Sequence, residues 1–275
     1  MTSIAEHIAR ERGLVGAKQL RYSLDFAQYY HRWYSNVLLG LLPSDRSYTV
    51  LDCGCGTGVL LPPLRQRSGK TVGLDLCWEN LREARVGHGA GPLVVADVAR
   101  LPVAPASFNQ IVCRGVLHRL ADVAPGLREL CAALKPGGDL VISEPIGDSR
   151  AVSVLRDAAF AAGMHPFPGQ RLRYLTVHEW IAAAHAAGLR TERWFHLGYV
   201  AFPLIGFPDA VPLMRHLPGR MAIARLLLHV DRVLARTPGV RTRSWQAVFH
   251  FRKPPSQPGT AESSRQREHA PVRAK

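Results

Sequence analysis

Short, almost entirely apolar runs alternate with amphipathic segments between residues 48 and 143. The apolar runs are about five residues long, and the segments between them have apolar side chains at helical intervals. Strands that are apolar on both faces and are joined by helices are typical of a doubly wound parallel α/β sheet. The pattern predicts strands at 48–52, 71–75, 93–97, 108–113 and 139–143, and helices at 59–67, 78–86 and 123–134.

Helical and strand-like segments also flank this region. Residues 3–42 are predicted to be helical, because Ser3 and Glu6 have the spacing of a capping box and apolar side chains recur at helical intervals after them. A second capping-box pair, Thr176 and Glu179, opens another helix. The C-terminal half is predicted to contain helices at 176–187 and 219–236 and strands at 191–201 and 244–253.

These segments divide the chain into three parts. Residues 1–44 form a predicted N-terminal helical cap, and residues 45–253 form the predicted α/β domain. Within that domain, residues 202–243 are an apolar, proline-broken insert before the last strand, which suits the wall or lid of an acceptor pocket. The polar, proline-bearing segment 254–275 is predicted to be disordered.

A glycine-rich turn follows the first predicted strand, in the sequence VLDCGCGTG at 50–58. The strand ends in Asp52, and Gly54, Gly56 and Gly58 precede a helix. Glycines at these positions let the chain turn tightly and let its backbone approach a ligand. Taken alone, the loop is equally consistent with a nucleotide-binding loop or a structural turn.

Two further aspartates end the next two predicted strands. Asp75 is placed to accept hydrogen bonds from ribose hydroxyls, and Asp97 from the amino group of an adenine. Ligands of open parallel sheets bind beyond the carboxyl ends of the strands, so Asp52, Asp75 and Asp97 are expected to line one crevice. Each aspartate taken singly is also typical of a turn, and it is the ordered set that favours a ligand site.

Five motifs resemble the class I S-adenosylmethionine-dependent methyltransferases, and in particular the small-molecule branch related to ubiquinone and menaquinone methyltransferases. They occur in the expected order: VLDCGCGTG, GLD, VVADVARLPVAPASFNQIVC, LHRL and LREL…LKPGGDLVISEP, within residues 45–145. The resemblance implies a Rossmann-like, doubly wound, seven-stranded sheet with an antiparallel final hairpin, formed here by 191–201 and 244–253. One departure is Asn109, where the family commonly has Asp.

The same resemblance implies S-adenosyl-L-methionine as the cofactor and assigns residues to its parts. The methionine part would face Asp52 and the three loop glycines, and Arg114 and Gly115 would lie near the methionyl arm. The ribose would be held at Asp75 and Leu76, and the adenine at Asp97 and Val98. Aromatic residues of the N-terminal helix are placed either to cover the cofactor or to pack between helices: Tyr22, Tyr29, Tyr30, Trp33 and Tyr34.

His118, in LHRL just past the fourth strand, is the candidate general base. Methyl transfer from a sulfonium needs alignment, exclusion of water and, for O–H acceptors, removal of a proton, which a neutral imidazole can accept. A purely structural role for this histidine is the alternative. The other histidines show no metal-site spacing, so no metal is expected. The absence of NPPY-like and Pro-Cys elements counts against methylation of nucleic-acid bases.

The charge of the chain is strongly positive and unevenly distributed. The formal net charge is +14, and residues 171–253 hold 13 basic and 4 acidic side chains. Such a surface suits an acidic small molecule, a carrier protein, a membrane surface or nucleic acid, and it is also compatible with a solvated face that has no specific partner. The helix at 219–236 carries an arginine stripe that suits either a lid or an acidic lipid surface.

Composition places the chain among folded, cytoplasmic proteins. Its 275 residues are 47% hydrophobic, which excludes a disordered chain, and no apolar run is long enough for a membrane span. The N-terminus does not look like a secretory signal, and the odd count of five cysteines favours reduced, buried thiols.

The sequence therefore predicts an enzyme that transfers a methyl group to a small, largely apolar acceptor that carries an anionic group. Oxygen is the favoured acceptor atom, and carbon or nitrogen is an alternative. Peripheral contact with a membrane is compatible with the basic helix. Two other hypotheses are an RNA- or protein-directed methyltransferase that uses the basic half for docking, and a non-catalytic binding subunit with the same fold.

Overall fold

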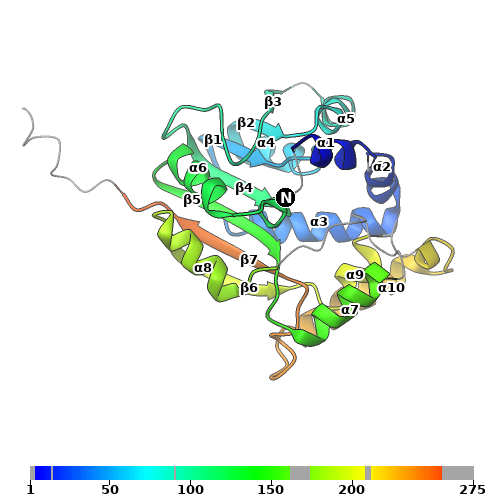
Figure 1. The fold of residues 1–275 in the computed structure, drawn as a ribbon. Coiled ribbons are helices and arrows are strands. Elements are labelled where there is room, and N and C mark those ends of the chain that lie inside the picture. The colour runs from blue at the N-terminus through cyan, green and yellow to red at the C-terminus, as the bar shows by residue number, and fades with distance from the viewer. Residues whose placement is uncertain (1–3, 14, 90, 162–173, 208–211, 256–275) are drawn as a thin grey trace, which may run out of the picture.

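The structure of the chain is a computed structural model that describes residues 4–13, 15–89, 91–161, 174–207 and 212–255. Its described residues contain a seven-stranded sheet with the strand order β3-β2-β1-β4-β5-β7-β6 (Figure 1). The strands are β1 (Asp45–Cys53), β2 (Ser68–Asp75), β3 (Leu93–Val95), β4 (Phe108–Arg114), β5 (Leu134–Pro145), β6 (Arg190–Leu197) and β7 (Gln246–Arg252).

The first five strands are parallel, and the last two reverse the direction of the sheet. β7 lies between β5 and β6 and is antiparallel to both, so that Ser143 of β5 faces Val248 of β7. The predicted Rossmann-like sheet with an antiparallel final hairpin is therefore confirmed. Because β1, β2 and β4 run side by side in the same direction, their carboxyl ends meet at one edge of the sheet.

Helices cover both faces of the sheet, and each face has its own apolar core. Strand side chains such as Val50, Val112 and Val141 pack with α3, α9 and α10, whereas Leu51, Ile111 and Ile142 pack with α6 and α8. We call these the α3 face and the α6 face. The helices are α1 (Ile4–Gly13), α2 (Val15–Ser23), α3 (Asp25–Leu39), α4 (Leu61–Arg67), α5 (Trp78–His88), α6 (Ala124–Ala133), α7 (Arg150–Ala161), α8 (Val177–Ala186), α9 (Ala201–Ile205) and α10 (Arg220–Leu234).

The N-terminal helical run is divided more finely than its periodicity predicts. Residues 4–39 form three helices, and Leu24 adopts an extended conformation immediately before α3. Ser23 and Asp25 flank this break, and both residue types favour helix ends and turns over helix interiors. The predicted cap at Ser3 lies outside the described residues.

The segments after residue 145 hold the largest differences from the prediction. The strand predicted at 191–201 ends at Leu197, because Gly198 has a φ of +73° and the chain turns into α9. Helix α7 was not predicted, since it exposes Val154 and Leu155 and buries the charged Arg156. The capping box of Thr176 and Glu179 is confirmed at the start of α8. The tail predicted to be disordered lies almost entirely outside the described residues.

Other predicted features have smaller corrections or are confirmed. The third strand ends at Val95, and Asp97 forms an isolated bridge with Arg100. The helix predicted from residue 59 begins at Leu61. All five cysteines are buried and unpaired. No helix in the described part of the chain has both the length and the apolar content to cross a membrane.

Asp231 anchors α10 to the segment that leads into α9. Its side chain is 3% exposed, and its two carboxylate oxygens accept hydrogen bonds from the backbone N–H groups of Tyr199, Val200 and Ala201, at 2.7–3.1 Å. These three N–H groups lie at the turn after β6. A single acidic residue thus fixes the position of α10 against the end of the sheet.

Asp231→Ala is therefore expected to lower the free energy of unfolding by about 3 kcal/mol, because three backbone donors lose a charged acceptor in a buried environment. Urea unfolding measures this loss. The control is His229→Ala on the exposed side of the same helix, which should change stability by less than about 0.5 kcal/mol. Equal effects of the two substitutions would contradict the anchoring role.

Candidate active site

The glycine-rich loop after β1 is tied to the end of β2. The backbone N–H groups of Gly54 and Cys55 both donate to the carbonyl of Leu74, at 2.7 and 2.8 Å. Gly54 has a φ of +72°, and a Cβ there would lie 2.1 Å from a methyl carbon of Val116, so only glycine fits. A Cβ on Gly56 would meet no atom within 4 Å, which leaves the space in front of this backbone open.

Asp75, at the end of β2, holds the same loop through its side chain. Oδ2 accepts the N–H of Gly56 at 2.8 Å, while Oδ1 accepts the N–H of Cys77 at 2.9 Å and the side-chain amide of Asn80 at 3.0 Å. Each carboxylate oxygen can accept two hydrogen bonds. Oδ2 of Asp75 therefore keeps the capacity for one more donor beside the open backbone of Gly56.

Asp52 and Arg114 project from neighbouring strands toward the α3 face. Each lies two residues after a valine of the α3-face core, Val50 and Val112, and strand side chains alternate between faces. Asp52 is 2% exposed, and burial raises its pKa to about 7; the nearby Arg114 guanidinium opposes that rise and the Asp75 carboxylate adds to it. Among the described residues, neither Oδ2 of Asp52 nor Nη1 of Arg114 has a hydrogen-bond partner.

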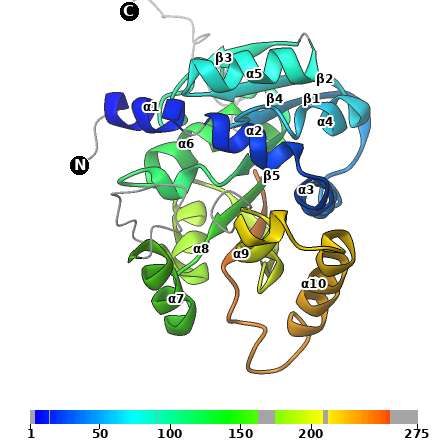
Figure 2. The ribbon, with the colours of Figure 1, turned by 90° about the vertical axis from the view of Figure 1, so that its right-hand side faces the viewer.

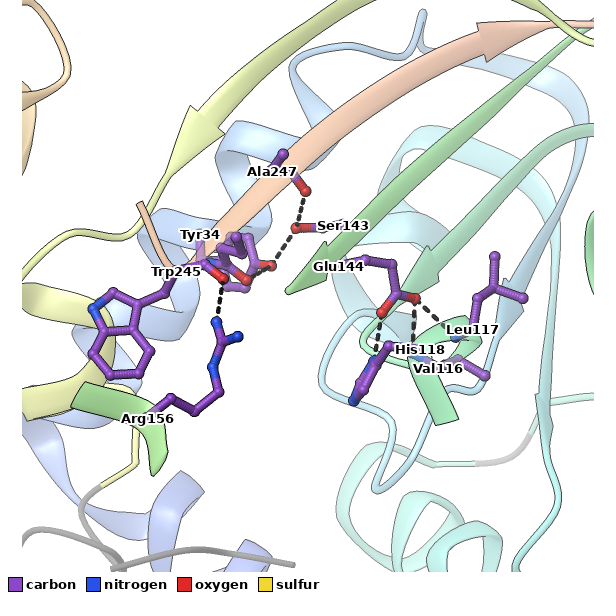
Figure 3. Close-up of polar contacts among 10 residues, drawn as sticks. Tyr34, Val116, Leu117, His118, Ser143, Glu144, Arg156, Trp245 and Ala247 are labelled. Atoms are coloured by element: carbon purple, nitrogen blue, oxygen red, sulfur yellow. Dashed lines mark hydrogen bonds and ion pairs between the residues drawn. The ribbon is translucent and has the colours of Figure 1, made fainter. Parts of the chain in front are cut away.

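Tyrosines of the N-terminal helices contact Arg114. The Arg114 guanidinium lies 5.3 Å from the ring centre of Tyr34, and its Nη2 is 3.5 Å from the hydroxyl of Tyr22. The Tyr34 hydroxyl in turn contacts Ser143 Oγ at 2.5 Å and donates to the side-chain oxygen of Gln246 at 2.8 Å (Figure 3). The N-terminal helices thus complete the site from above the α3 face.

His118 is paired with Glu144 at the end of β5. Glu144 Oε1 accepts the N–H groups of Val116 and Leu117, at 2.9 and 2.8 Å, and Oε2 lies 2.6 Å from Nδ1 of His118 (Figure 3). Glu144 is fully buried and the His118 side chain is 10% exposed. Since the carboxylate is the acceptor, we assign the proton to Nδ1, which leaves the lone pair of Nε2 available.

The remaining predicted site residues occupy the same edge of the sheet. Asp97 lies in the turn after β3, where its Oδ1 accepts the N–H of Ala99 at 2.8 Å, and the adjacent Val98 is buried. Leu76 follows Asp75 directly, and the N–H of Gly115 donates to the carbonyl of Ser143 at 2.8 Å.

Two predicted features lie away from this edge. Gly58, the last loop glycine, packs toward Ala84 of α5. Asn109 lies at the opposite, amino end of β4, where its Oδ1 accepts from the Thr49 N–H and the Lys135 ammonium. The departure from the family pattern at Asn109 therefore does not touch the candidate site.

Sequence reasoning missed the residues that hold the predicted ones in place. Glu144 was visible only as part of an EP dipeptide, and nothing in the sequence linked it to His118, 26 residues earlier. Arg156 of the unpredicted α7 was also missed. Its guanidinium stacks 3.9 Å from the ring centre of Tyr174 and donates to the carbonyl of Ile146. It also donates to the carbonyl of Trp245 (Figure 3). The one signal in the sequence was the position of Arg156 among apolar residues.

Comparison with known proteins supports the reading of these motifs. Residues 26–193 match the family model described as a methyltransferase domain. The chain is 31% identical over 185 residues to the malonyl-[acyl-carrier protein] O-methyltransferase of Enterobacter lignolyticus, and the match covers 67% of this chain and 69% of that protein. The chain belongs to the methyltransferase-domain family. It is an S-adenosylmethionine-dependent enzyme.

Two other similarities are narrower. The demethylmenaquinone methyltransferase of Corynebacterium urealyticum is 36% identical to the present chain over 106 residues. This match covers 38% of the present chain and 44% of the Corynebacterium protein. The solved geranyl diphosphate C-methyltransferase of Streptomyces coelicolor, in complex with S-adenosyl-L-homocysteine, has a TM-score of 0.56 at 13% identity. This match covers 82% of this chain and 80% of that one, and it shows the shared fold alone.

The residues at the strand ends of this methyltransferase fit its cofactor. The methionine part of S-adenosylmethionine carries an ammonium and a carboxylate, and the unpartnered atoms of Asp52 and Arg114 are a carboxylate oxygen and a guanidinium nitrogen on one face. The open backbone at Gly56 and the spare acceptor capacity of Asp75 suit a ribose placed between them. When bound, the cofactor supplies an electrophilic methyl group on a sulfonium.

Cofactor binding is expected to release a proton from Asp52. Below pH 7 the buried carboxyl of the free protein is largely protonated, and a ligand ammonium beside it favours the charged form and lowers its pKa. Calorimetric titration with S-adenosylmethionine at pH 6.5, in buffers with different ionisation enthalpies, measures the released protons. The release should shrink above pH 8, where the free carboxyl is already ionised.

Asp52→Asn is the matched control for this experiment. The amide has almost the same shape as the carboxyl but cannot titrate, so its proton release should disappear. Equal release from the variant and the wild-type protein would assign the protons to another group.

Proposed function

We propose that this methyltransferase transfers the cofactor methyl group to an oxygen atom of a small, largely apolar acceptor. The observation that carries the proposal is the His118–Glu144 pair, which lies on the loop directly after Arg114 and Gly115. A histidine whose Nδ1 donates to a buried carboxylate offers Nε2 as a proton acceptor in a fixed orientation. A hydroxyl acceptor needs such a base, because it is protonated at neutral pH.

Each residue of the pair has a separate role in this proposal. His118 Nε2 accepts the proton of an acceptor hydroxyl group, whereas a carboxyl acceptor is already ionised at neutral pH and needs only to be positioned. Glu144 orients the imidazole, and it also fixes the loop, because its other oxygen binds two backbone N–H groups of that loop. Alignment of acceptor and methyl group accounts for the rest of the catalysis.

The cofactor contacts follow the geometry of the strand ends. Asp52 and Arg114 bind the two charged groups of the methionine part, and the loop backbone at Gly54 and Gly56 lies along it. Asp75, next to Leu76, accepts from the ribose hydroxyls, and Asp97 with Val98 receives the adenine. Tyr22 and Tyr34 close the methionine end through their contacts with Arg114.

A row of partly exposed aromatic rings supports an apolar acceptor. The Tyr174 ring stacks toward His118 at 6.3 Å, and the buried Arg156 lies between Tyr174 and Trp245. Phe202 of α9 continues the row, 6.4 Å from Trp245. This row connects the insert at 202–243 with the candidate base. We therefore propose that the insert supplies the acceptor specificity.

The names of the relatives narrow the acceptor class. Those reported above are an O-methyltransferase of a malonyl-[acyl-carrier protein] and a demethylmenaquinone methyltransferase. The first name gives an acyl group on a carrier protein as the acceptor, and the second gives a demethylated menaquinone. The basic C-terminal half of the present chain favours the first kind, in which a short acyl acceptor is presented by an acidic carrier protein.

Asp75→Asn should weaken the binding of S-adenosylmethionine at least tenfold. The substitution replaces an acceptor oxygen with an amide donor that faces the N–H of Gly56, so both the loop and the ribose contact are disturbed. Isothermal titration calorimetry measures the affinity, and a thermal melt of the variant checks its folding. Unchanged affinity in the folded variant would refute the ribose assignment.

His118→Ala should lower kcat for methyl transfer by about 100-fold or more and leave the cofactor affinity unchanged. Glu144→Gln should give a smaller loss of kcat, because the amide still accepts the two backbone N–H groups of the loop although the imidazole loses its carboxylate partner. Transfer of labelled methyl to acceptors in a cell extract, with the product identified by mass, provides the assay. Full turnover of His118→Ala between pH 6 and 9 would exclude the base.

A further inference from the structure

The outer side of α10 presents a regular basic surface that the methyl-transfer site does not use. Six residues on this side are exposed, and Leu226 and Val233 are exposed to 60% and 52%. The helix lies at the periphery of the molecule, beside α9 (Figure 2). We call this surface the outer α10 face; it consists of Arg225, Leu226, His229, Arg232 and Val233 of the helix, together with Arg236 in the turn directly after it.

The positive charge of this face is uncompensated within the part of the chain that the structure describes. Residues 212–243 contain seven arginines, two histidines and one acidic residue, Asp231. That carboxylate is buried on the inner side of the helix and is bound to backbone N–H groups. No described acidic side chain pairs with Arg225, Arg232 or Arg236. The face therefore carries a concentrated charge of one sign.

The residues of this face repeat every seven positions. Within the helix, Arg225 pairs with Arg232 and Leu226 with Val233 at that spacing, and His229 has the same spacing from Arg236 in the turn after the helix. A seven-residue repeat keeps the same side of a helix aligned with a second helix along its length, and each repeat offers one apolar side chain and two arginine or histidine side chains. The helix is about 22 Å long, enough for a contact of two to three turns.

This arrangement fits a helical protein better than a membrane or RNA. Insertion into a bilayer needs a broad apolar face, whereas the apolar face of α10 is turned inward, with Ala224 and Leu228 buried, and the outer side offers two isolated aliphatic residues. A nucleic-acid surface does not need apolar residues placed between arginines. An acidic helix with small apolar residues between its carboxylates complements both components.

We propose that the outer α10 face is the docking site of a small, acidic, helical carrier protein that delivers the acceptor on a flexible arm. This docking site rests on the proposed function, because docking would be the route by which a carrier-bound acyl group reaches His118. α10 packs against α9, and α9 contributes Phe202 to the aromatic row that leads to the base. Docking on α10 thus places the arm at the outer end of that row.

The test measures binding of acyl carrier protein from Enterobacter lignolyticus, labelled with a fluorophore, by anisotropy at 50 and 200 mM salt. Three substitutions together, Arg225→Glu, Arg232→Glu and Arg236→Glu, should weaken binding at least tenfold and flatten its salt dependence. The control variant, Lys70→Glu, Arg85→Glu and Arg128→Glu, makes the same change in net charge at exposed residues of β2, α5 and α6. It should bind like the wild-type protein; Figure 2 shows α5 at the opposite end of the molecule from α10.

The proposal would be overturned if the wild-type protein did not bind the carrier protein. It would also be overturned if the α10 variant bound it as tightly as the wild-type protein does. Binding to phosphatidylglycerol vesicles or to RNA through the same arginines, without binding to the carrier protein, would also overturn it. Both multiple variants should keep the wild-type affinity for S-adenosylmethionine. A carrier protein that docks through α10 while its malonyl form accepts no methyl group would refute the proposed acceptor and leave the docking site standing.

Discussion

The attachment of the glycine-rich loop to the end of β2 is the constraint on which the site depends. The backbone of the loop donates twice to the Leu74 carbonyl and once to the Asp75 carboxylate. These bonds join the carboxyl ends of β1 and β2 and hold the backbone of Gly56 open at the sheet edge. Without them, the loop would have no fixed position relative to Asp52, Arg114 or the turn after β3.

The alternation of strand side chains separates two tasks at this edge. Asp52, Arg114, Ser143 and Gln246 project toward the α3 face, where Tyr22 and Tyr34 of the N-terminal helices contact the last three of them. Glu144, one residue after Ser143, projects to the other face and contacts the loop that carries His118. Consecutive residues of β5 thus serve the charged ligand region on one side and the candidate base on the other. The alternation of side chains along the strand places both groups, without a flexible segment to position either of them.

The sequence predicted the central sheet and the strand-end residues well, for a physical reason. Buried parallel strands must be apolar on both faces, so their boundaries are visible as runs, and glycines with acids at their ends are equally local signals. Asp52, Asp75 and Asp97 could therefore be expected at one edge from the order of the strands, whereas Arg114 was assigned through the family resemblance.

The parts that could not be predicted depend on contacts between distant residues. Glu144 meets His118 only after β4 and β5 pair, and Tyr34 meets Gln246 across 212 positions of the chain. Helix α7 escaped notice because its buried side contains Arg156, whose charge is tolerated through two carbonyl contacts and the Tyr174 ring. Local patterns carry no information about such compensation. Strand β6 ends four residues before its predicted end, because the chain turns at Gly198 and the carboxylate of Asp231 in α10 holds the backbone of the next residues.

The three hydrogen bonds of Asp231 also limit how far α10 can be displaced from the sheet. The helix cannot slide along its axis or rotate about it without breaking all three bonds at once, because they converge on one carboxylate. The backbone under its outer side is consequently rigid. A protein that binds there would contact arginines on a helix whose backbone is already fixed, so little association free energy would be lost in ordering that backbone.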